Sequence, residues 1–182
     1  GDFAMIIKGG IVYDPANEIF GEEMDICIEN GKVVEDTNST EEIDARSLLV
    51  MPGGVDGHAH IAGKVNTGRI MRPEDSRLNI EPRTKLLRPS TGYTVPNCYA
   101  TGYRYARMGY TMAFEAATPI LESRHTHEEL EEIPIVDKGA LTLFGDNWET
   151  FDCVREDDME KLAAYIAWGL KASRGYGVKV VN

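Results

Sequence analysis

The chain has 182 residues, of which 42% are hydrophobic and 27% charged. This composition is typical of a globular domain with a buried core and excludes a mainly disordered chain. No stretch reaches the roughly 18 to 20 apolar residues that a membrane span needs, and no basic and apolar leader opens the chain, so we expect a cytoplasmic protein. The three cysteines lie far apart without a CxxC pair, which argues against a disulfide framework and a thiolate zinc knuckle.

The formal net charge of −11 argues against nucleic-acid binding, because phosphate neutralisation needs a basic face. The charge is unevenly spread. Residues 61–90 contain seven basic and three acidic side chains and carry +4, so the rest of the chain carries −15. The basic residues are Lys64, Arg69, Arg72, Arg77, Arg83, Lys85 and Arg88. A positive segment in an acidic chain predicts an anionic ligand or an acidic partner.

Short strands dominate the first 51 residues. Residues 1–4 precede Met5, where a clean strand pattern begins, and we expect them to be left over from an expression vector. From there to Met51, apolar runs alternate with turn signals, and Asn30-Gly31 between two runs is a strong hairpin signal. We therefore predict that residues 5–51 form a small antiparallel sheet, the N-terminal part of a small β domain, which needs a packing partner.

After Pro52 the pattern changes to strands that alternate with helices, as in βα units around a parallel sheet. Strands are predicted at residues 54–56, 111–117, 141–144 and 177–181. Helices are predicted at 99–108, from a capping box of Thr126 and Glu129, and at 157–173. The predicted fold class is α/β, with residues 52–182 as the first four units of a truncated (β/α)8 barrel, a fold that takes about 250 residues when complete.

Candidate metal ligands follow the first of these strands, in the segment Pro-Gly-Gly-Val-Asp-Gly-His-Ala-His at residues 52–60. Imidazoles at positions i and i+2 of an extended segment point to one side, about 6.5 to 7 Å apart, so His58 and His60 can reach one metal ion. Histidine suits Zn²⁺, and Asp56 could orient a ring. The spacing alone leaves a pair of ordinary loop histidines as an equal alternative.

Lys179 lies within the apolar run at residues 177–181. A lysine inside a buried strand is costly unless its charge is removed or paired, and conversion to a carbamate would turn it into an anionic oxygen ligand. The alternative is a lysine that extends its amine into solvent from the end of a strand.

The segment 52–60, the small β region before it and Lys179 resemble the amidohydrolase superfamily. The similarity is closer to the A subunits of formylmethanofuran dehydrogenase, and rests on residues 52–60, Tyr-Thr-Val-Pro-Asn at 93–97, Gly-Tyr-Thr-Met-Ala-Phe-Glu-Ala-Ala at 109–117, and residues 175–182. Together these stretches span nearly all of residues 5–182.

The resemblance implies two zinc ions, with His58 and His60 as ligands of one and carboxylated Lys179 as the bridge. It implies that a metal-bound hydroxide interconverts N-formylmethanofuran with formate and methanofuran in archaeal methanogenesis, while a tungsten or molybdenum subunit interconverts formate and CO₂. The remaining histidines and the catalytic aspartate would come from later strands. We therefore expect no catalytic residue within the chain, no activity of the chain alone, and weak zinc binding or none.

Two weaker candidates accompany this site. His125-Thr126-His127 repeats the spacing, but at a predicted helix start where the rings would face solvent. The basic segment follows the first barrel strand, so Arg69, Arg72, Arg77 or Arg83 could bind the carboxylates of an anionic substrate. Their alternative role is pairing with acidic groups of this chain or of a partner.

Two other functions stay open at this stage. One is a cyclic amidase such as a dihydroorotase or hydantoinase relative, although the long insert between His60 and Tyr99 argues against it. The other is a non-catalytic assembly module that self-associates through unpaired barrel edges; a monomer at high concentration would contradict that idea.

Overall fold

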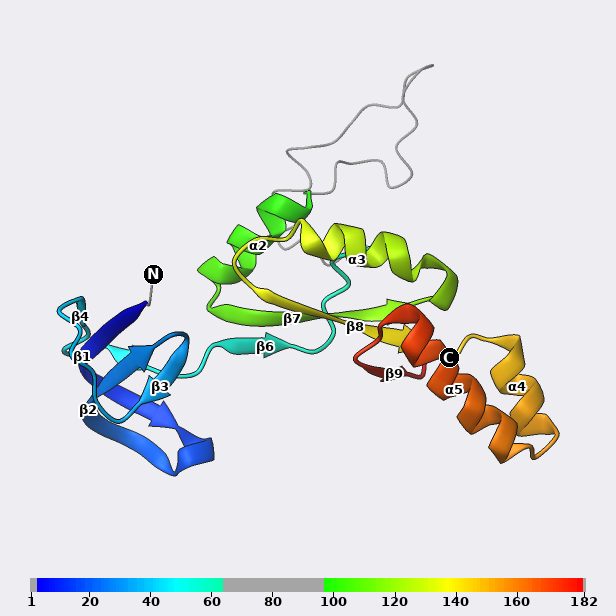
Figure 1. Ribbon diagram of the computed structural model, residues 1–182, viewed down its shortest axis with the longest axis horizontal. Helices are drawn as coiled ribbons and strands as arrows, with labels where there is room; N and C mark the ends of the chain where they lie inside the picture. Colours follow the sequence, from blue (N-terminus) through cyan, green and yellow to red (C-terminus); the bar gives the residue numbers. More distant parts are fainter. Residues whose placement is uncertain (1–2, 64–96, 182) are drawn as a thin grey trace, which may run out of the picture. The chain divides into compact units, whose positions relative to one another are not determined.

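The structure is a computed structural model that describes residues 3–63 and 97–181. The chain divides into two compact units, residues 1–52 and 53–182, which Figure 1 shows in ribbon form. Within the described part of the chain, no helix is long and apolar enough to cross a membrane. The four arginines of the predicted substrate site lie outside the described residues.

The first unit is one five-stranded sheet. Its strands are β1 (Ala4–Asp14), β2 (Ile19–Glu29), β3 (Lys32–Val34), β4 (Glu42–Asp44) and β5 (Leu49–Val50), and the short 3-10 helix η1 (Pro15–Asn17) links the first two. The order is β3-β2-β1-β4, with β5 also on β1. The β1–β2 and β2–β3 pairs are antiparallel, but β4 and β5 run parallel to β1. The prediction of a purely antiparallel sheet is therefore wrong, because the chain crosses back after the hairpin and re-enters beside β1 in the same direction.

The predicted hairpin is confirmed. Asn30 and Gly31 have φ values of 50° and 77°, the pair of positive angles that a tight two-residue hairpin turn requires. The strand β1 begins before Met5, since Ala4 pairs with Glu29. The vector-derived origin expected for the first residues did not exclude Ala4 from the sheet.

The second unit contains a four-stranded parallel sheet. Its strands are β6 (Gly54–Asp56), β7 (Tyr110–Thr118), β8 (Asp137–Leu143) and β9 (Gly177–Lys179), and their order in the sheet is their order in the sequence. All three neighbouring pairs are parallel. This is the predicted succession of βα units, with half the strand number of a (β/α)8 barrel.

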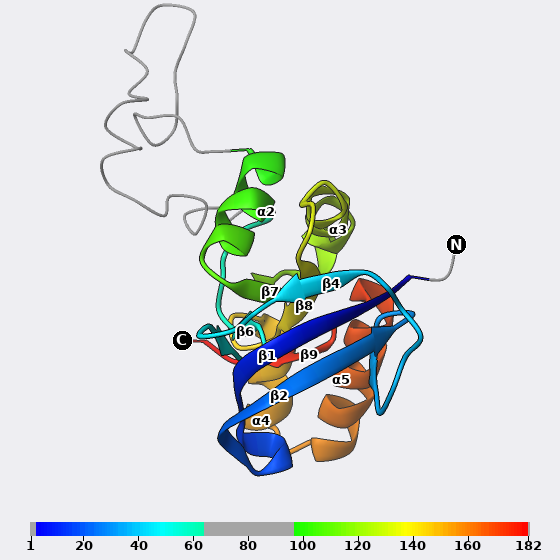
Figure 2. The same cartoon turned by 90° about the vertical axis from the view of Figure 1, so that its left-hand side faces the viewer.

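Helices connect these strands (Figures 1 and 2). They are α2 (Cys98–Arg107), the 3-10 turn η3 (Ile120–Glu122), α3 (Ser123–Glu131), α4 (Trp148–Arg155) and α5 (Met159–Ser173). Helix α2 packs on β7, α3 on β8, and α5 on both β8 and β9, while α4 packs against α5. Helix α4 was not among the predicted elements.

Two details of the predicted helices are wrong. Thr126 does not cap α3, which begins at Ser123; it is buried in the helix, and its hydroxyl donates to the carbonyl of Glu122 at 3.2 Å. In α2, the predicted aromatic face is exposed, and the buried face carries Tyr105 and Gly102 instead. A Cβ at Gly102 would lie 2.2 Å from the carbonyl oxygen of Pro134, so this close approach selects the glycine face.

The core of the second unit includes the segment that follows β6. Ala59, Ile61 and Ala62 are buried, and they belong to one apolar cluster with Tyr105 of α2 and Leu130 of α3. Burial of a large aliphatic side chain stabilises by roughly 1.5 to 3 kcal/mol. The residues on either side of His60 are therefore anchored in the core, which fixes where this histidine can lie.

Candidate functional site

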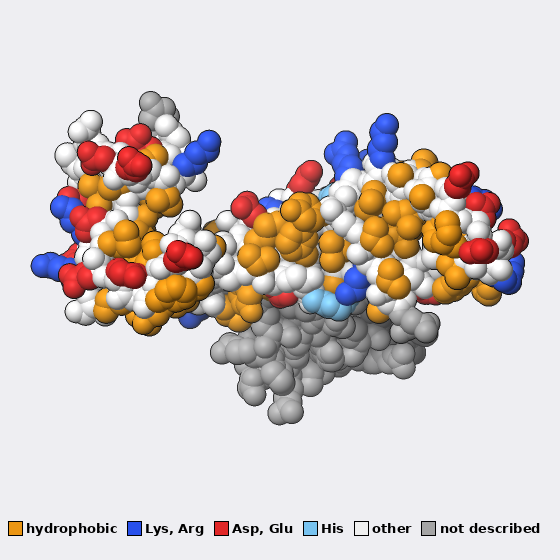
Figure 3. All heavy atoms as spheres, turned by 90° about the horizontal axis from the view of Figure 1, so that it is seen from below, with side chains coloured by type: hydrophobic (Ala, Val, Ile, Leu, Met, Phe, Trp, Pro, Cys, Tyr) orange, Lys and Arg blue, Asp and Glu red, His pale blue; other side chains and the backbone are white. Residues whose placement is uncertain are grey.

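The two histidines of the first HxH motif lie together at the carboxyl end of β6. The imidazole Nε2 atoms of His58 and His60 are 2.9 Å apart, and the rings meet edge to face with centroids separated by 4.6 Å. His58 is exposed and His60 is partly buried. Figure 3 shows histidine side chains at the surface of the second unit, beside a basic side chain.

The rings do not meet by the predicted route. Strand β6 ends at Asp56, so neither histidine is in an extended strand. His60 has a φ of 47°, in the left-handed region that non-glycine residues seldom occupy. The predicted separation of about 6.5 to 7 Å along a strand is therefore wrong. The reversal of the backbone at His60 turns the two rings toward each other.

Asp56 supports this segment through its backbone. The carboxylate accepts a hydrogen bond from the backbone N of His58 at 3.0 Å and one from the Tyr105 hydroxyl at 2.8 Å. Burial raises the pKa of the Tyr105 hydroxyl, and the hydrogen bond to Asp56 raises it further. Asp56 was predicted to orient an imidazole ring, but it holds the main chain at His58 instead.

Lys179 reaches the same place from the other edge of the sheet. It is the last residue of β9, and its Nζ lies 3.2 Å from Nδ1 of His58. The side chain is partly exposed, so it is not a fully buried lysine of the kind first considered. The sequence separates Lys179 from His58 by 121 residues, and the parallel order of the sheet brings them together.

Glu115 completes the group. It lies on β7 between the strands that carry the other residues, and only 1% of its surface is exposed. Its Oε1 is 3.2 Å from Nδ1 of His60, and its Oε2 accepts the backbone N–H of Ala62 at 2.8 Å. The sequence analysis did not single out this residue. The available signal was one acidic residue within the otherwise uncharged run of buried strand β7.

These contacts define the direction of every hydrogen bond in the group. A carboxylate only accepts, so Nδ1 of His60 carries the proton and its Nε2 has a free lone pair. His58 must then donate from Nε2 to that lone pair, and its Nδ1 accepts from the donor Lys179. The row Lys179, His58, His60 and Glu115 is thus a continuous chain of hydrogen bonds with a donor at one end and an acceptor at the other.

The donor set fits a metal ion of the zinc type. Two nitrogen ligands at about 2.0 to 2.1 Å from a tetrahedral zinc ion lie roughly 3.3 Å apart, close to the 2.9 Å between the two Nε2 atoms. Among the described residues, no cluster of three or more histidine, cysteine, aspartate or glutamate side chains could hold a metal. A third ligand from this part of the chain must therefore be of another type, such as a modified lysine.

The second HxH motif makes no comparable pair. Both histidines lie within α3, where Nε2 of His125 is 3.7 Å from Glu129. Nε2 of His127 donates to the carbonyl of Ser173 on α5 at 2.8 Å. His127 therefore does not face solvent as predicted, because it ties α3 to α5. The two rings have different partners and share no metal position.

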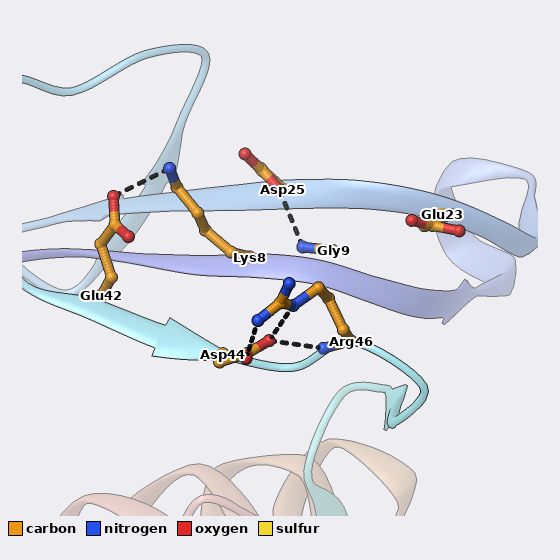
Figure 4. Close-up of a pocket in the computed structure, with 7 residues that line it drawn as sticks. All are labelled: Lys8, Gly9, Glu23, Asp25, Glu42, Asp44 and Arg46. Atoms are coloured by element: carbon orange, nitrogen blue, oxygen red, sulfur yellow. Dashed lines mark hydrogen bonds and ion pairs between the residues drawn. The ribbon is translucent and has the colours of Figure 1, made fainter.

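A second concave surface lies on the first unit, over β1, β2 and β4 (Figure 4). It has a volume of about 570 Å³ and is lined by Lys8, Gly9, Glu23, Asp25, Glu42, Asp44 and Arg46. Lys8 pairs with Glu42 at 2.8 Å, and Asp25 accepts the backbone N–H of Gly9 at 2.8 Å. The hydrogen bonds from Arg46 hold the pKa of Asp44 at about 2. These charges largely satisfy one another, so the histidine group is the better candidate site.

Residues 41–182 match the sequence profile of the amidohydrolase family, and the chain belongs to this family. The four parallel strands of the second unit are accordingly the first half of an amidohydrolase-type barrel.

Individual relatives narrow the similarity. The chain is 54% identical to the protein FwdA of Methanocaldococcus jannaschii over 97% of its own length and 31% of the relative's length. It is 34% identical to the A-type component of the formyltransferase/hydrolase complex Fhc of Methylorubrum extorquens, over 97% of this chain and 32% of that protein. The chain thus spans about a third of the curated relatives that it matches along its whole length.

A solved structure agrees with this similarity. The crystal structure of the formyltransferase/hydrolase complex from M. extorquens with methylofuran contains a chain that matches with a TM-score of 0.79 and 33% identity, over 99% of this chain and 33% of that one. A dihydroorotase of Elusimicrobium minutum is 48% identical over 61 residues, but these cover only 31% of this chain. The alternative of a cyclic amidase is therefore not favoured.

Proposed function

We propose that this chain supplies the first part of a binuclear zinc site in a protein of the same type as the A subunits of formylmethanofuran dehydrogenase. His58 and His60 are the ligands of one ion, and carboxylated Lys179 bridges the two. The observation that carries the proposal is the convergence of His58, His60 and Lys179, from opposite edges of the sheet, within hydrogen-bond distance.

The hydrogen bonds support carboxylation of Lys179. If Nε2 of His58 binds a metal, the ring proton must lie on Nδ1, which then becomes a donor toward Lys179. An ammonium group is also only a donor, so the contact at 3.2 Å would place two donors together. Reaction of the neutral Lys179 amine with CO₂ forms an N–C bond, releases one proton and gives an anionic oxygen that can accept from Nδ1 and bind metal.

The proposed reaction is the interconversion of N-formylmethanofuran with formate and methanofuran. When bound, zinc would polarise the formyl oxygen and lower the pKa of water to about 7. Within this chain, His58 and His60 hold the metal, and Asp56 and Glu115 hold the two histidines. The 54% identity to FwdA supports this assignment, and the methylofuran in the Fhc complex supports a related furan cofactor and an assembly of several subunits.

We extend the proposal to the setting of the reaction. A tungsten- or molybdenum-containing partner would exchange formate with CO₂ in archaeal methanogenesis. Arg69, Arg72, Arg77 and Arg83 are proposed to bind the substrate's carboxylates, because guanidinium groups bind carboxylates through paired hydrogen bonds. A cytoplasmic location stays a prediction. The ligands and the aspartate expected from later strands would make residues 5–182 inactive alone.

Activity and ligand assays test this proposal. The full reading frame that contains this chain is purified, and release of formate from N-formylmethanofuran is compared with hydrolysis of dihydroorotate. We expect formate release, its loss by at least roughly 100-fold in Lys179→Ala, and near wild-type rates in His125→Ala, which changes the other HxH motif. Equal rates for Lys179→Ala and wild type, or turnover of dihydroorotate alone, would overturn the proposal.

A further inference from the structure

We propose that Glu115 is the positioning residue of the histidine pair. Its side chain holds His60 in the left-handed backbone conformation and keeps the ring proton on Nδ1, so that Nε2 is presented to the ligand. The inference rests on the proposed function only where it names a metal ion as that ligand.

The backbone of His60 needs external support. A non-glycine residue in the left-handed region costs roughly 1 to 2 kcal/mol, and such residues persist where their surroundings hold them. The backbone N–H of Ala59 donates to the carbonyl of Phe114 at 2.9 Å, and that of Ala62 donates to Oε2 of Glu115 at 2.8 Å. Adjacent residues of β7 thus hold the chain on both sides of His60.

Glu115 also fixes the ring of His60. The two carboxylate oxygens have separate tasks, since Oε1 faces Nδ1 of His60 and Oε2 takes the amide of Ala62. Both contacts are met at once only if the ring follows the turned backbone. In this position, Nε2 of His60 lies 2.9 Å from Nε2 of His58, with its lone pair directed at the space between the rings.

A structural role alone does not account for a carboxylate at this place. Burying a carboxylate is costly unless several hydrogen bonds compensate it, and an apolar side chain of similar volume is often as stabilising. Here the compensating partners are the ring of His60, the amide of Ala62 and, at 3.4 Å, the amide of Ala117. The two shorter contacts both belong to the turn that carries His60, which indicates that positioning of this histidine is the role of Glu115.

The test uses Glu115→Gln in the full reading frame. Glutamine keeps the shape but has one acceptor oxygen, so it cannot accept from both His60 and Ala62. The matched control is Glu129→Gln, because Glu129 also accepts an amide of this turn, that of Gly63. The readouts are the protonated nitrogen of His60, from ¹H–¹⁵N correlations of the metal-free protein, and zinc affinity measured against a chelator.

We expect Glu115→Gln to lose the single Nδ1-protonated form of His60 and to weaken zinc binding by about 10- to 100-fold. The control should keep that form and lose less affinity. If Glu115→Gln fails to fold, Glu115→Asp replaces it, since aspartate keeps the charge but shortens the reach; the expected changes are the same in direction.

An unchanged His60 tautomer and an unchanged zinc affinity in the Glu115 variant would overturn the inference, even if the thermal stability fell. The NMR readout needs no metal. Wild-type protein that binds no zinc would therefore overturn the proposed function, while the tautomer of His60 would still decide the role of Glu115.

Discussion

Gly63 ends the turn that carries the histidines, and its replacement by alanine probes how tightly α3 holds this turn. Gly63 has a φ of 68°, and an added Cβ would lie 2.4 Å from Oγ1 of Thr126. Thr126 is only 1% exposed, and its hydroxyl is committed to the carbonyl of Glu122, so it cannot easily move away. Gly63→Ala should therefore introduce both backbone strain and a clash.

The magnitude follows from a matched glycine. Gly109 has a φ of 84°, but an added Cβ would meet nothing within 4 Å. Gly109→Ala should destabilise the second unit by about 1 kcal/mol, the cost of a left-handed alanine. Gly63→Ala carries the same cost plus roughly 1 to 3 kcal/mol for overpacking, which gives about 2 to 4 kcal/mol.

Denaturant unfolding followed by tryptophan fluorescence measures this difference. The chain has two tryptophans, Trp148 and Trp168, and both lie in the second unit. The double variant Gly63→Ala/Thr126→Ala should recover about 1 kcal/mol of the loss through coupling of neighbouring sites. If Gly63→Ala costs no more than Gly109→Ala, or if Thr126→Ala gives no recovery, the described packing of the turn against α3 is incorrect.

Three further predictions concern other contacts. Tyr105→Phe removes the hydrogen bond to Asp56 and should lower the free energy of unfolding by about 1 kcal/mol, and an unchanged value would contradict the contact. Ile61→Ala removes a side chain with no exposed surface and should cost roughly 2 to 5 kcal/mol in the same assay; a loss below about 1 kcal/mol would refute its core position. Arg46→Ala should raise the pKa of Asp44 from about 2 toward the ordinary value of 3.8, as measured by NMR titration. Because folding lowers this pKa, the ion pair stabilises above about pH 4 and loses its effect as pH falls toward 2; a pKa that stays near 2 in the variant would show another cause.

The sequence predicted the parts of the fold that depend on local chemistry. The Asn30-Gly31 turn and the order of strands from β6 to β9 are confirmed, because turn residues and apolar runs determine them locally. The parallel entry of β4 beside β1 was not predictable in this way. Antiparallel and parallel partners have similar residue patterns in such short strands, and the choice depends on the path of the whole chain.

The site was predicted in its residues but not in its geometry. His58, His60 and Lys179 do meet, yet they do so through the left-handed turn at His60 rather than along an extended strand. Residue spacing does not reveal such a turn, since it depends on contacts with β7 and the core. The same limit explains the missed Glu115, whose partner His60 lies 55 residues away.

The zinc content of the purified full reading frame tests the central claim most directly. Elemental analysis is made on wild-type protein and on His58→Asn, His60→Asn and Lys179→Ala variants, with His125→Asn as the matched control. We predict about two zinc ions per chain in the wild type and in the control, and a loss of zinc in each of the three site variants. Full zinc content in those three variants, or a wild-type protein without bound metal, would contradict a metal site built on His58, His60 and Lys179.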